Sequence, residues 1–212
     1  MTTIYLLRHG ALPEIWRERF VGQIDPPLGL EGVSQAEALA GSLSRRKIDA
    51  IFCSDLVRSR QTASIIADAA NAPFTARRDL REVALGEWDG VLRREVAEHD
   101  PEQFAARGKD IEHHRIPGGE SFADCRERVL AAWGDIIRPD WQRVVVVGHA
   151  GINRLLLCHF MGIPVARMFT LGQDYGCVNV IEQDAGEVRV LQVNRRCEEL
   201  DVGAGTESHE SI

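Results

Sequence analysis

The chain has 212 residues, of which 44% are hydrophobic and 27% are charged, and its formal net charge is −7. This length and composition predict one soluble globular domain with a single core. The acidic balance argues against a general nucleic-acid or anionic-membrane binder, because both need a basic surface, and no apolar stretch is long enough to span a membrane.

Two further features predict a cytoplasmic protein. The N-terminus lacks the charged, apolar and small-residue order of a signal peptide. The five cysteines are odd in number, widely spaced and without a C-x-x-C pair. That pattern fits free thiols in a reducing compartment, and neither a disulfide framework nor a zinc site.

Strand and helix signals alternate along the first part of the chain. The apolar run 4–7 predicts a strand, and the spacing of apolar residues over 31–43 predicts a helix. A short strand follows over 49–53, after which Ser54-Asp55 offers N-cap chemistry to a helix that ends near residue 71. This order is typical of a βαβ unit.

The second part of the chain continues the alternation. The elements it predicts are a short strand and turn over 75–82, helices over 93–99, 101–107, 122–137 and 149–161, and strands over 144–147, 178–181 and 188–193. Such alternation predicts an α/β three-layer sandwich, in which helices flank a mostly parallel central sheet. We expect one catalytic domain over 1–197 and a flexible tail over 198–212, which lacks periodicity.

Residues able to carry chemistry follow the predicted strands or lie close behind them. They are Arg8, His9, Arg58, Glu82 and His149. Ligands bind at the carboxyl edge of a sheet of this kind, so we expect these side chains to meet there. Any one of them alone is more often a structural residue, and only their combination favours function.

The five side chains suit phosphoryl transfer. Guanidinium forks and an imidazole can bind the oxygens of a phosphoryl group, and we therefore assign Arg8, Arg58 and His149 to phosphate binding. A neutral His9 can attack phosphorus, while Glu82 can protonate the leaving group and then activate water. This chemistry requires no metal and no cofactor.

Six sequence blocks resemble one known family. They are Leu7-Arg8-His9-Gly10, Arg19-Phe20-x-Gly22, the string from Ser54 to Ala63, Leu80-x-Glu82 with Gly86-x-Trp88-x-Gly90, Pro117-Gly118-Gly119-Glu120-Ser121, and Gly148-His149. In this order they resemble the histidine phosphatase superfamily, also called the phosphoglycerate-mutase-like family. The resemblance implies that family's fold and His9 as the phosphorylated nucleophile. It also implies Glu82 as proton donor and acceptor beside the phosphate-binding side chains.

Two reactions compete within this family, namely hydrolysis of a phosphomonoester and phosphate transfer by a cofactor-dependent phosphoglycerate mutase. The string 83–90, after Glu82, resembles the phosphatase branch. The string 173–181 resembles α-ribazole phosphatases, which implies α-ribazole 5′-phosphate as substrate, with Tyr175 or Trp16 as a wall against its flat base. A catalytically idle phosphate-binding module is the alternative from another class. The expected partner is a small phosphorylated metabolite, and the sequence leaves monomer or homodimer open.

The chain departs from the family pattern after the first motif. Ala11 and Ile15 stand where many members have a Glu and an Asn whose amide helps to hold the phosphate. One phosphate ligand is therefore missing, and we predict that the Gln23 amide replaces it. We expect Gly10 and Ala150, which follow the two histidines, to complete the phosphate site.

Overall fold

The computed structural model describes residues 1–138 and 140–201. Within them, six strands form one sheet in the order β3-β2-β4-β1-β5-β6. The strands are β1 (Thr2–Arg8), β2 (Ala50–Ser54), β3 (Phe74–Arg77), β4 (Arg143–Gly148), β5 (Val178–Asp184) and β6 (Glu187–Arg195). The first four pair in parallel, whereas β5 and β6 are antiparallel to their neighbours, which confirms the mostly parallel sheet.

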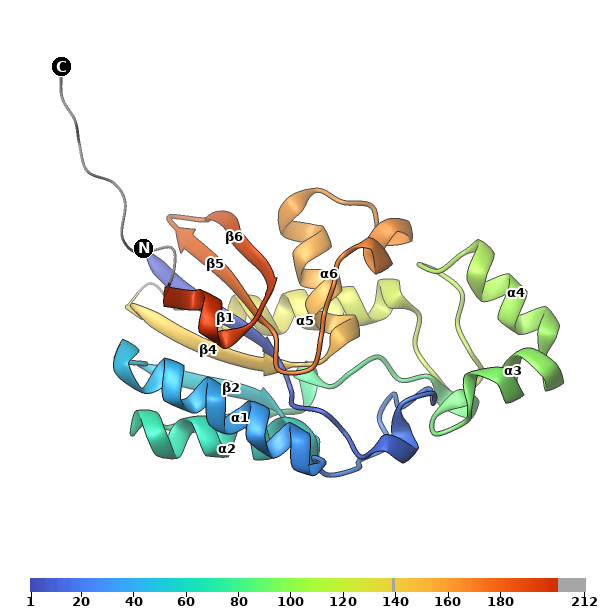
Figure 1. The fold of residues 1–212 in the computed structure, drawn as a ribbon. Helices are drawn as coiled ribbons and strands as arrows, with labels where there is room; N and C mark the ends of the chain where they lie inside the picture. The colour runs from blue at the N-terminus through green and yellow to red at the C-terminus, as the bar shows by residue number, and fades with distance from the viewer. Residues whose placement is uncertain (139, 202–212) are drawn as a thin grey trace, which may run out of the picture.

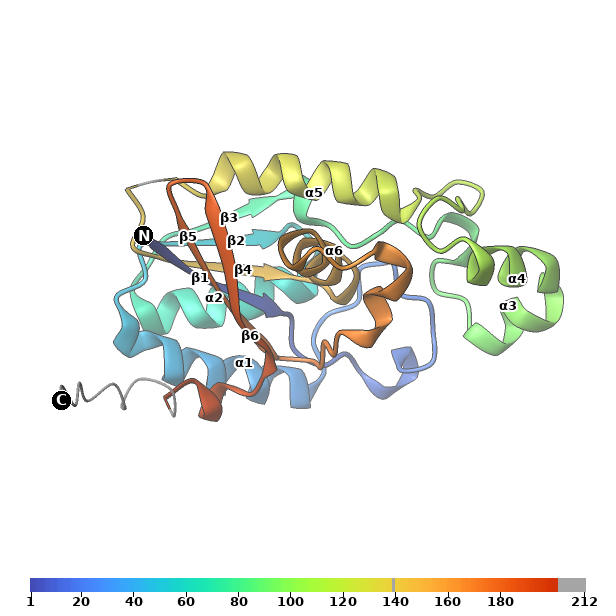
Figure 2. The same ribbon diagram turned by 90° about the horizontal axis from the view of Figure 1, so that it is seen from above.

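Helices cover both faces of this sheet. They are α1 (Leu30–Leu43), α2 (Val57–Ala70), α3 (Arg93–His99), α4 (Pro101–Lys109), α5 (Phe122–Ile136) and α6 (Ala150–Met161). One face carries α1 and α2 and the other carries α5 and α6 (Figures 1 and 2), which confirms the three-layer sandwich.

The valine run of β4 shows how the sequence builds these layers. Val144 and Val146 join the apolar cluster on the α5 and α6 face, whereas Val145 and Val147 join the cluster on the α1 and α2 face. A strand covered on both faces needs apolar side chains at every position, and that need explains the unbroken run.

Helices α3 and α4 lie away from these layers. They project past the carboxyl ends of the parallel strands (Figures 1 and 2). Among their described residues, only Val96 is buried. We call the two helices the cap.

The start of α2 differs from the prediction. Ser54 is the last residue of β2, and Leu56 is the N-cap of the helix. The Ser54 hydroxyl accepts a hydrogen bond from the Leu56 N–H at 3.2 Å, and Asp55 forms an ion pair with Arg81 at 2.6 Å. The predicted Ser54-Asp55 N-cap was wrong because both side chains bind elsewhere.

The beginning of the predicted tail also differs. A 3₁₀ helix spans Cys197–Asp201, and Leu200 within it is buried in the cluster on the α1 and α2 face. The remainder of the predicted tail, 202–212, lies outside the described residues.

All five cysteines are free thiols, as predicted from their number and spacing. No helix in the described part of the chain is both long enough and apolar enough to cross a membrane.

Candidate active site

Strand pairing brings the two motif histidines together. Arg8 and Gly148 are partners in the register of β1 and β4, and the His9 N–H donates to the Gly148 carbonyl at 3.2 Å. Both strands end at this point, so the rings of His9 and His149 lie 5.1 Å apart between centroids. The parallel pairing thus delivers both imidazoles to one place.

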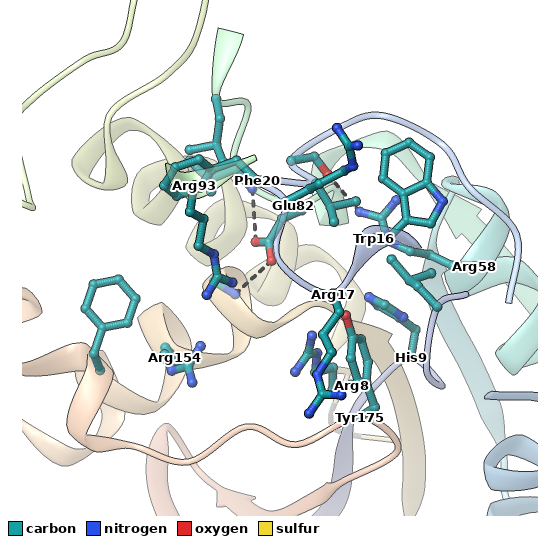
Figure 3. A pocket seen from close by; sticks show the side chains of 18 of the residues that line it. Arg8, His9, Trp16, Arg17, Phe20, Arg58, Glu82, Arg93, Arg154 and Tyr175 are labelled. Atoms are coloured by element: carbon teal, nitrogen blue, oxygen red, sulfur yellow. Dashed lines mark hydrogen bonds between the residues drawn. The ribbon is translucent and has the colours of Figure 1, made fainter. Parts of the chain in front are cut away.

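A cavity of about 440 Å³ opens at this edge of the sheet. Its volume suits a small molecule. The predicted residues that line it are Arg8, His9, Trp16, Arg58, Glu82 and Tyr175 (Figure 3). His149 is fully buried against His9. In the described part of the chain no cluster of three or more His, Cys, Asp or Glu side chains could hold a metal ion.

The His9 ring is held in one tautomer. Its Nδ1 lies 2.8 Å from the Gly10 carbonyl, which can only accept, so Nδ1 carries the proton and Nε2 keeps its lone pair. Burial, followed by the charges of Arg58 and Arg8, holds the pKa of His9 well below its ordinary value. The ring is therefore neutral near pH 7 and can act as a nucleophile.

Unpartnered nitrogen atoms surround His9. The Nε atoms of Arg8 and Arg58 and both ring nitrogens of His149 are buried, and none has a hydrogen-bond partner among the described residues. Buried polar atoms without partners are costly, and native proteins contain few of them. Their convergence from three elements indicates a binding site for an anion.

The two guanidinium groups are fixed by backbone carbonyls. Arg58 donates to the carbonyls of Gly22 at 2.8 Å and Ile24 at 2.7 Å, and Arg8 donates to the Gln173 carbonyl at 2.6 Å. Burial lowers the pKa of Arg58 to about 10, which leaves the group charged at neutral pH. Both charges are thus positioned before any ligand arrives.

Glu82 reaches the pocket at the start of α6. Its carboxylate accepts hydrogen bonds from the N–H groups of Gly151 at 2.9 Å, Ile152 at 3.2 Å and Val83 at 3.0 Å. A Cβ on residue 151 would overlap this carboxylate, so only glycine lets it approach the helix. These N–H groups fix the position of the Glu82 carboxyl group beside the cavity.

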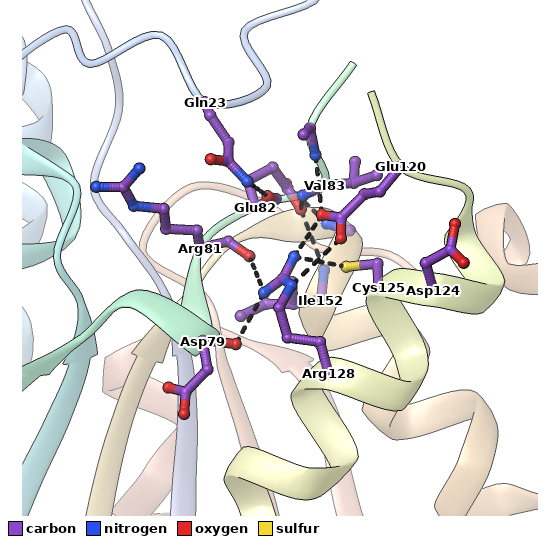
Figure 4. Close-up of polar contacts among 12 residues, drawn as sticks. Gln23, Asp79, Arg81, Glu82, Val83, Glu120, Asp124, Cys125, Arg128 and Ile152 are labelled. Carbon is purple, nitrogen blue, oxygen red and sulfur yellow. Dashed lines mark hydrogen bonds and ion pairs between the residues drawn. The ribbon is translucent and has the colours of Figure 1, made fainter. Parts of the chain in front are cut away.

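A network beneath Glu82 holds its loop (Figure 4). Arg128 donates to the carbonyls of Asp79 at 2.8 Å and Arg81 at 3.1 Å, and it forms an ion pair with Glu120. Glu120 in turn accepts from the Ala84 N–H at 3.0 Å. The backbone on both sides of Glu82 is therefore tied to α5.

Two predicted phosphate ligands lie elsewhere. The Gln23 amide donates to the Glu82 carbonyl at 3.0 Å, and Gln23 lines a separate surface cavity rather than the one beside His9 (Figure 4). Ala150 begins α6 without lining the pocket, which Gly151 lines instead. Gly10 acts through its carbonyl on His9, and a Cβ there would overlap the backbone of Gly32. In this structure Gln23 and Ala150 therefore lie outside the cavity beside His9.

We expect Gln23→Ala to leave the inhibition constant for vanadate unchanged within about twofold, because the amide binds a carbonyl outside the phosphate site. Loss of one hydrogen bond should lower the free energy of unfolding by about 1 kcal/mol. Inhibition assays and thermal unfolding check both values. A tenfold weaker inhibition would return this amide to the phosphate site.

Several pocket residues had escaped the sequence analysis. Ile15 is exposed, whereas Arg17, which was not predicted, lines the cavity next to the predicted Trp16. Arg154 also lines it, three residues after Gly151 on the same face of α6. That helical spacing was the available signal for Arg154. Arg107 in the cap had none, because its position depends on how the cap packs near Phe122 at the start of α5.

The buried histidines predict a pH-dependent stability. Burial, and then the charge of Arg58, lowers the pKa values of His9 and His149 well below normal. In the unfolded chain both bind protons near pH 6.5, so the unfolded state takes up more protons than the folded state below that pH. We expect the free energy of unfolding to fall below about pH 6.5, by up to about 1.4 kcal/mol per pH unit for each histidine.

Urea unfolding between pH 7.5 and 5 measures this slope. The double variant His9→Asn/His149→Asn is the matched comparison, because it removes both titrations and leaves the carboxylates in place. The same slope in both proteins would assign the pH dependence to other groups.

Comparisons with known proteins agree with this geometry. The family model described as Histidine phosphatase superfamily (branch 1) matches residues 4–196. "Phosphoserine phosphatase 1" of Hydrogenobacter thermophilus is 32% identical over 198 residues, which cover 93% of this chain and 94% of the relative.

Two solved structures are similar over nearly the whole chain. An α-ribazole phosphatase from Shigella flexneri has a TM-score of 0.83 and 26% identity, covering 92% of this chain and 97% of its own. A mycobacterial glucosyl-3-phosphoglycerate phosphatase in complex with VO3 has a TM-score of 0.80 and 28% identity, covering 92% and 99%. All three similar proteins are named as phosphatases, and their names give three different substrates.

Proposed function

This chain belongs to the histidine phosphatase superfamily (branch 1), and from that premise we propose that it hydrolyses the phosphomonoester of a small metabolite through a phosphohistidine at His9, without a metal ion. The observation that carries the proposal is the neutral His9 ring among the unpartnered nitrogens of Arg8, Arg58 and His149. A phosphoryl group would satisfy these donors with its oxygens while its phosphorus faces His9 Nε2.

In the first step, the Nε2 lone pair of His9 forms a bond to phosphorus and the bond from phosphorus to the leaving oxygen breaks. The Glu82 carboxyl gives its proton to that oxygen. The His9 ring becomes positively charged, and its Nδ1–H remains bound to the Gly10 carbonyl, which stabilises that charge. The oxygens of the transferred phosphoryl group remain hydrogen-bonded to the guanidinium groups of Arg8 and Arg58.

In the second step, the Glu82 carboxylate takes a proton from water, and the water oxygen bonds to phosphorus. The bond between phosphorus and nitrogen breaks, its electron pair returns to His9 Nε2, and inorganic phosphate leaves. Glu82 ends the cycle protonated, as it began. Its position at the start of α6 supports this double role, because the carboxylate faces the same cavity as His9.

For the substrate we retain α-ribazole 5′-phosphate as one candidate. Tyr175 lines the cavity and its ring lies 3.6 Å from the Arg8 guanidinium carbon, which places an aromatic wall beside the phosphate site. Phosphoserine and glucosyl-3-phosphoglycerate are the other candidates, from the names of the similar proteins.

The test is phosphate release in the presence of EDTA from an aryl phosphate, α-ribazole 5′-phosphate, phosphoserine and 3-phosphoglycerate. Turnover that EDTA leaves intact supports a metal-independent phosphatase, and the highest kcat/KM identifies the preferred class. Isomerisation of 3-phosphoglycerate without phosphate release would replace hydrolysis by mutase activity. No reaction with any compound would favour an idle phosphate-binding module.

A further inference from the structure

The cavity carries more positive charge than one phosphoryl group needs. The chain has 32 Asp and Glu against 25 Lys and Arg, yet among the described residues seven arginines and one carboxylate, Glu82, line the cavity. Beyond Arg8 and Arg58, the arginines are Arg17, Arg19, Arg93, Arg107 and Arg154.

Three of these five have partners of their own. Arg17 forms an ion pair with Glu14 at 3.0 Å. Arg19 donates to two backbone carbonyls, at 3.1 and 2.8 Å, and Arg154 donates to the Leu171 carbonyl at 2.9 Å. Arg93 and Arg107 remain, and both come from the cap.

Arg107 is a partly buried charge without a counterion. Its guanidinium carbon lies 5.3 Å from the ring centroid of Phe122, 5.7 Å from that of Phe20 and 5.9 Å from that of Trp88. The described residues offer it no hydrogen bond and no ion pair. Burial, followed by the charge of Arg93, lowers its pKa. Three aromatic rings thus lie near a group that normally pairs with an anion.

Arg93 lies near the same aromatic ring as Arg107, that of Phe20. Its guanidinium carbon is 5.8 Å from the Phe20 centroid, and it too has no side-chain partner within the described chain. Two like charges held close together repel each other unless an anion lies between them. In Figure 3, Arg93 lies on the opposite side of the Glu82 carboxylate from His9 and Arg58. Arg93 therefore lies apart from the phosphate site within the same cavity.

On the basis of the function proposed above, we propose that Arg107 and Arg93 bind a second anionic group of the substrate, a carboxylate or another phosphate, remote from the phosphoryl group that His9 attacks. The planar guanidinium fork matches either group with two parallel hydrogen bonds. The cap would then select phosphorylated acids or bisphosphates over a nucleoside monophosphate with an uncharged base.

Matched substrate pairs test this selectivity. The pairs are phosphoserine with phosphoethanolamine, 3-phosphoglycerate with glycerol 3-phosphate, and fructose 1,6-bisphosphate with fructose 6-phosphate. We expect the member with the second anion to have a kcat/KM about tenfold higher or more, mainly through a lower KM. The first two pairs report a carboxylate, and the third reports a phosphate.

Arg107→Met should lower kcat/KM for the member with the second anion far more than for its partner, and so bring the ratio between the two close to one. Methionine keeps an apolar stem against the aromatic rings and removes only the charge. Arg94→Met is the matched control, because Arg94 also belongs to the cap, follows Arg93 on α3, is exposed and does not line the cavity. That variant should keep the wild-type ratio.

Three results would overturn the inference. They are equal kcat/KM values within every pair for the wild type, a preference for α-ribazole 5′-phosphate over all the dianionic compounds, and equal losses for both members of a pair in Arg107→Met. In each case hydrolysis of the aryl phosphate would leave the proposed function standing. If no ester is hydrolysed, calorimetric binding of 3-phosphoglycerate and glycerol 3-phosphate to the wild type still decides the matter.

Discussion

Replacing His9 by Ala is expected to lower kcat/KM for every phosphate ester by about 10⁴-fold or more, since the proposed covalent step has no other nucleophile. The guanidinium groups of Arg8 and Arg58 are fixed by backbone carbonyls and do not depend on His9, so inorganic phosphate should still bind. Steady-state rates with an aryl phosphate and calorimetry with inorganic phosphate measure the two effects separately.

The covalent step can also be followed directly. Rapid quenching of the wild type during turnover should trap a phosphoryl label that is stable to base and labile to acid, as expected of a phosphorus–nitrogen bond, and His9→Ala should carry none. His113→Ala is the matched control, because His113 is exposed and its ring pairs with Asp110 outside the cavity. A His9→Ala protein that retains the label would place the nucleophile elsewhere.

The second large effect is expected for Glu82→Gln, and its size should depend on the leaving group. Esters of alcohols need the proton that we propose Glu82 supplies, so their kcat/KM should fall by about 10²- to 10⁴-fold. A nitrophenolate leaves without that proton, and the corresponding first step should hardly change. The plot of log kcat/KM against leaving-group pKa should therefore become steeper in the variant.

The Glu82→Gln substitution also changes the contacts at the start of α6. The NH₂ group of the new side chain cannot accept a hydrogen bond from the N–H of Gly151 or Ile152, so a modest loss of stability should accompany the kinetic effect. Glu87→Gln serves as the control, since Glu87 is exposed and does not line the cavity. Equal losses of kcat/KM for alcohol and nitrophenol esters would remove Glu82 from the role of proton donor.

Much of the fold could be predicted because its signals are local. The run 144–147 must be covered on both faces, and the apolar spacing over 31–43 shows one buried helical face. The strand order could not be predicted, because it depends on contacts between distant segments. The failed N-cap at Ser54-Asp55 has a similar cause, since Asp55 pairs with Arg81, 26 positions away.

Part of the candidate site could likewise be predicted from local sequence signals, and part could not. His9 and His149 directly follow strands, and the edge rule for parallel sheets brings them together. Gln23 lies in a long loop where no periodicity indicates the direction of a side chain, and its amide turns to the Glu82 carbonyl. Arg107 reaches the cavity only because the cap folds back over Phe122, a contact that no local pattern encodes.

The cap contributes little to the hydrophobic core, and this affects which substitutions such a protein can accept during evolution. Helices α3 and α4 bury only Val96 among their described residues, whereas the proposed nucleophile and phosphate ligands lie at the ends of buried strands and on α2. A substitution in the cap therefore costs little folding free energy and leaves the reacting groups in place. Related proteins that share the chemistry can therefore evolve different substrate preferences through substitutions in the cap. The intermediates along such a path would remain folded and active.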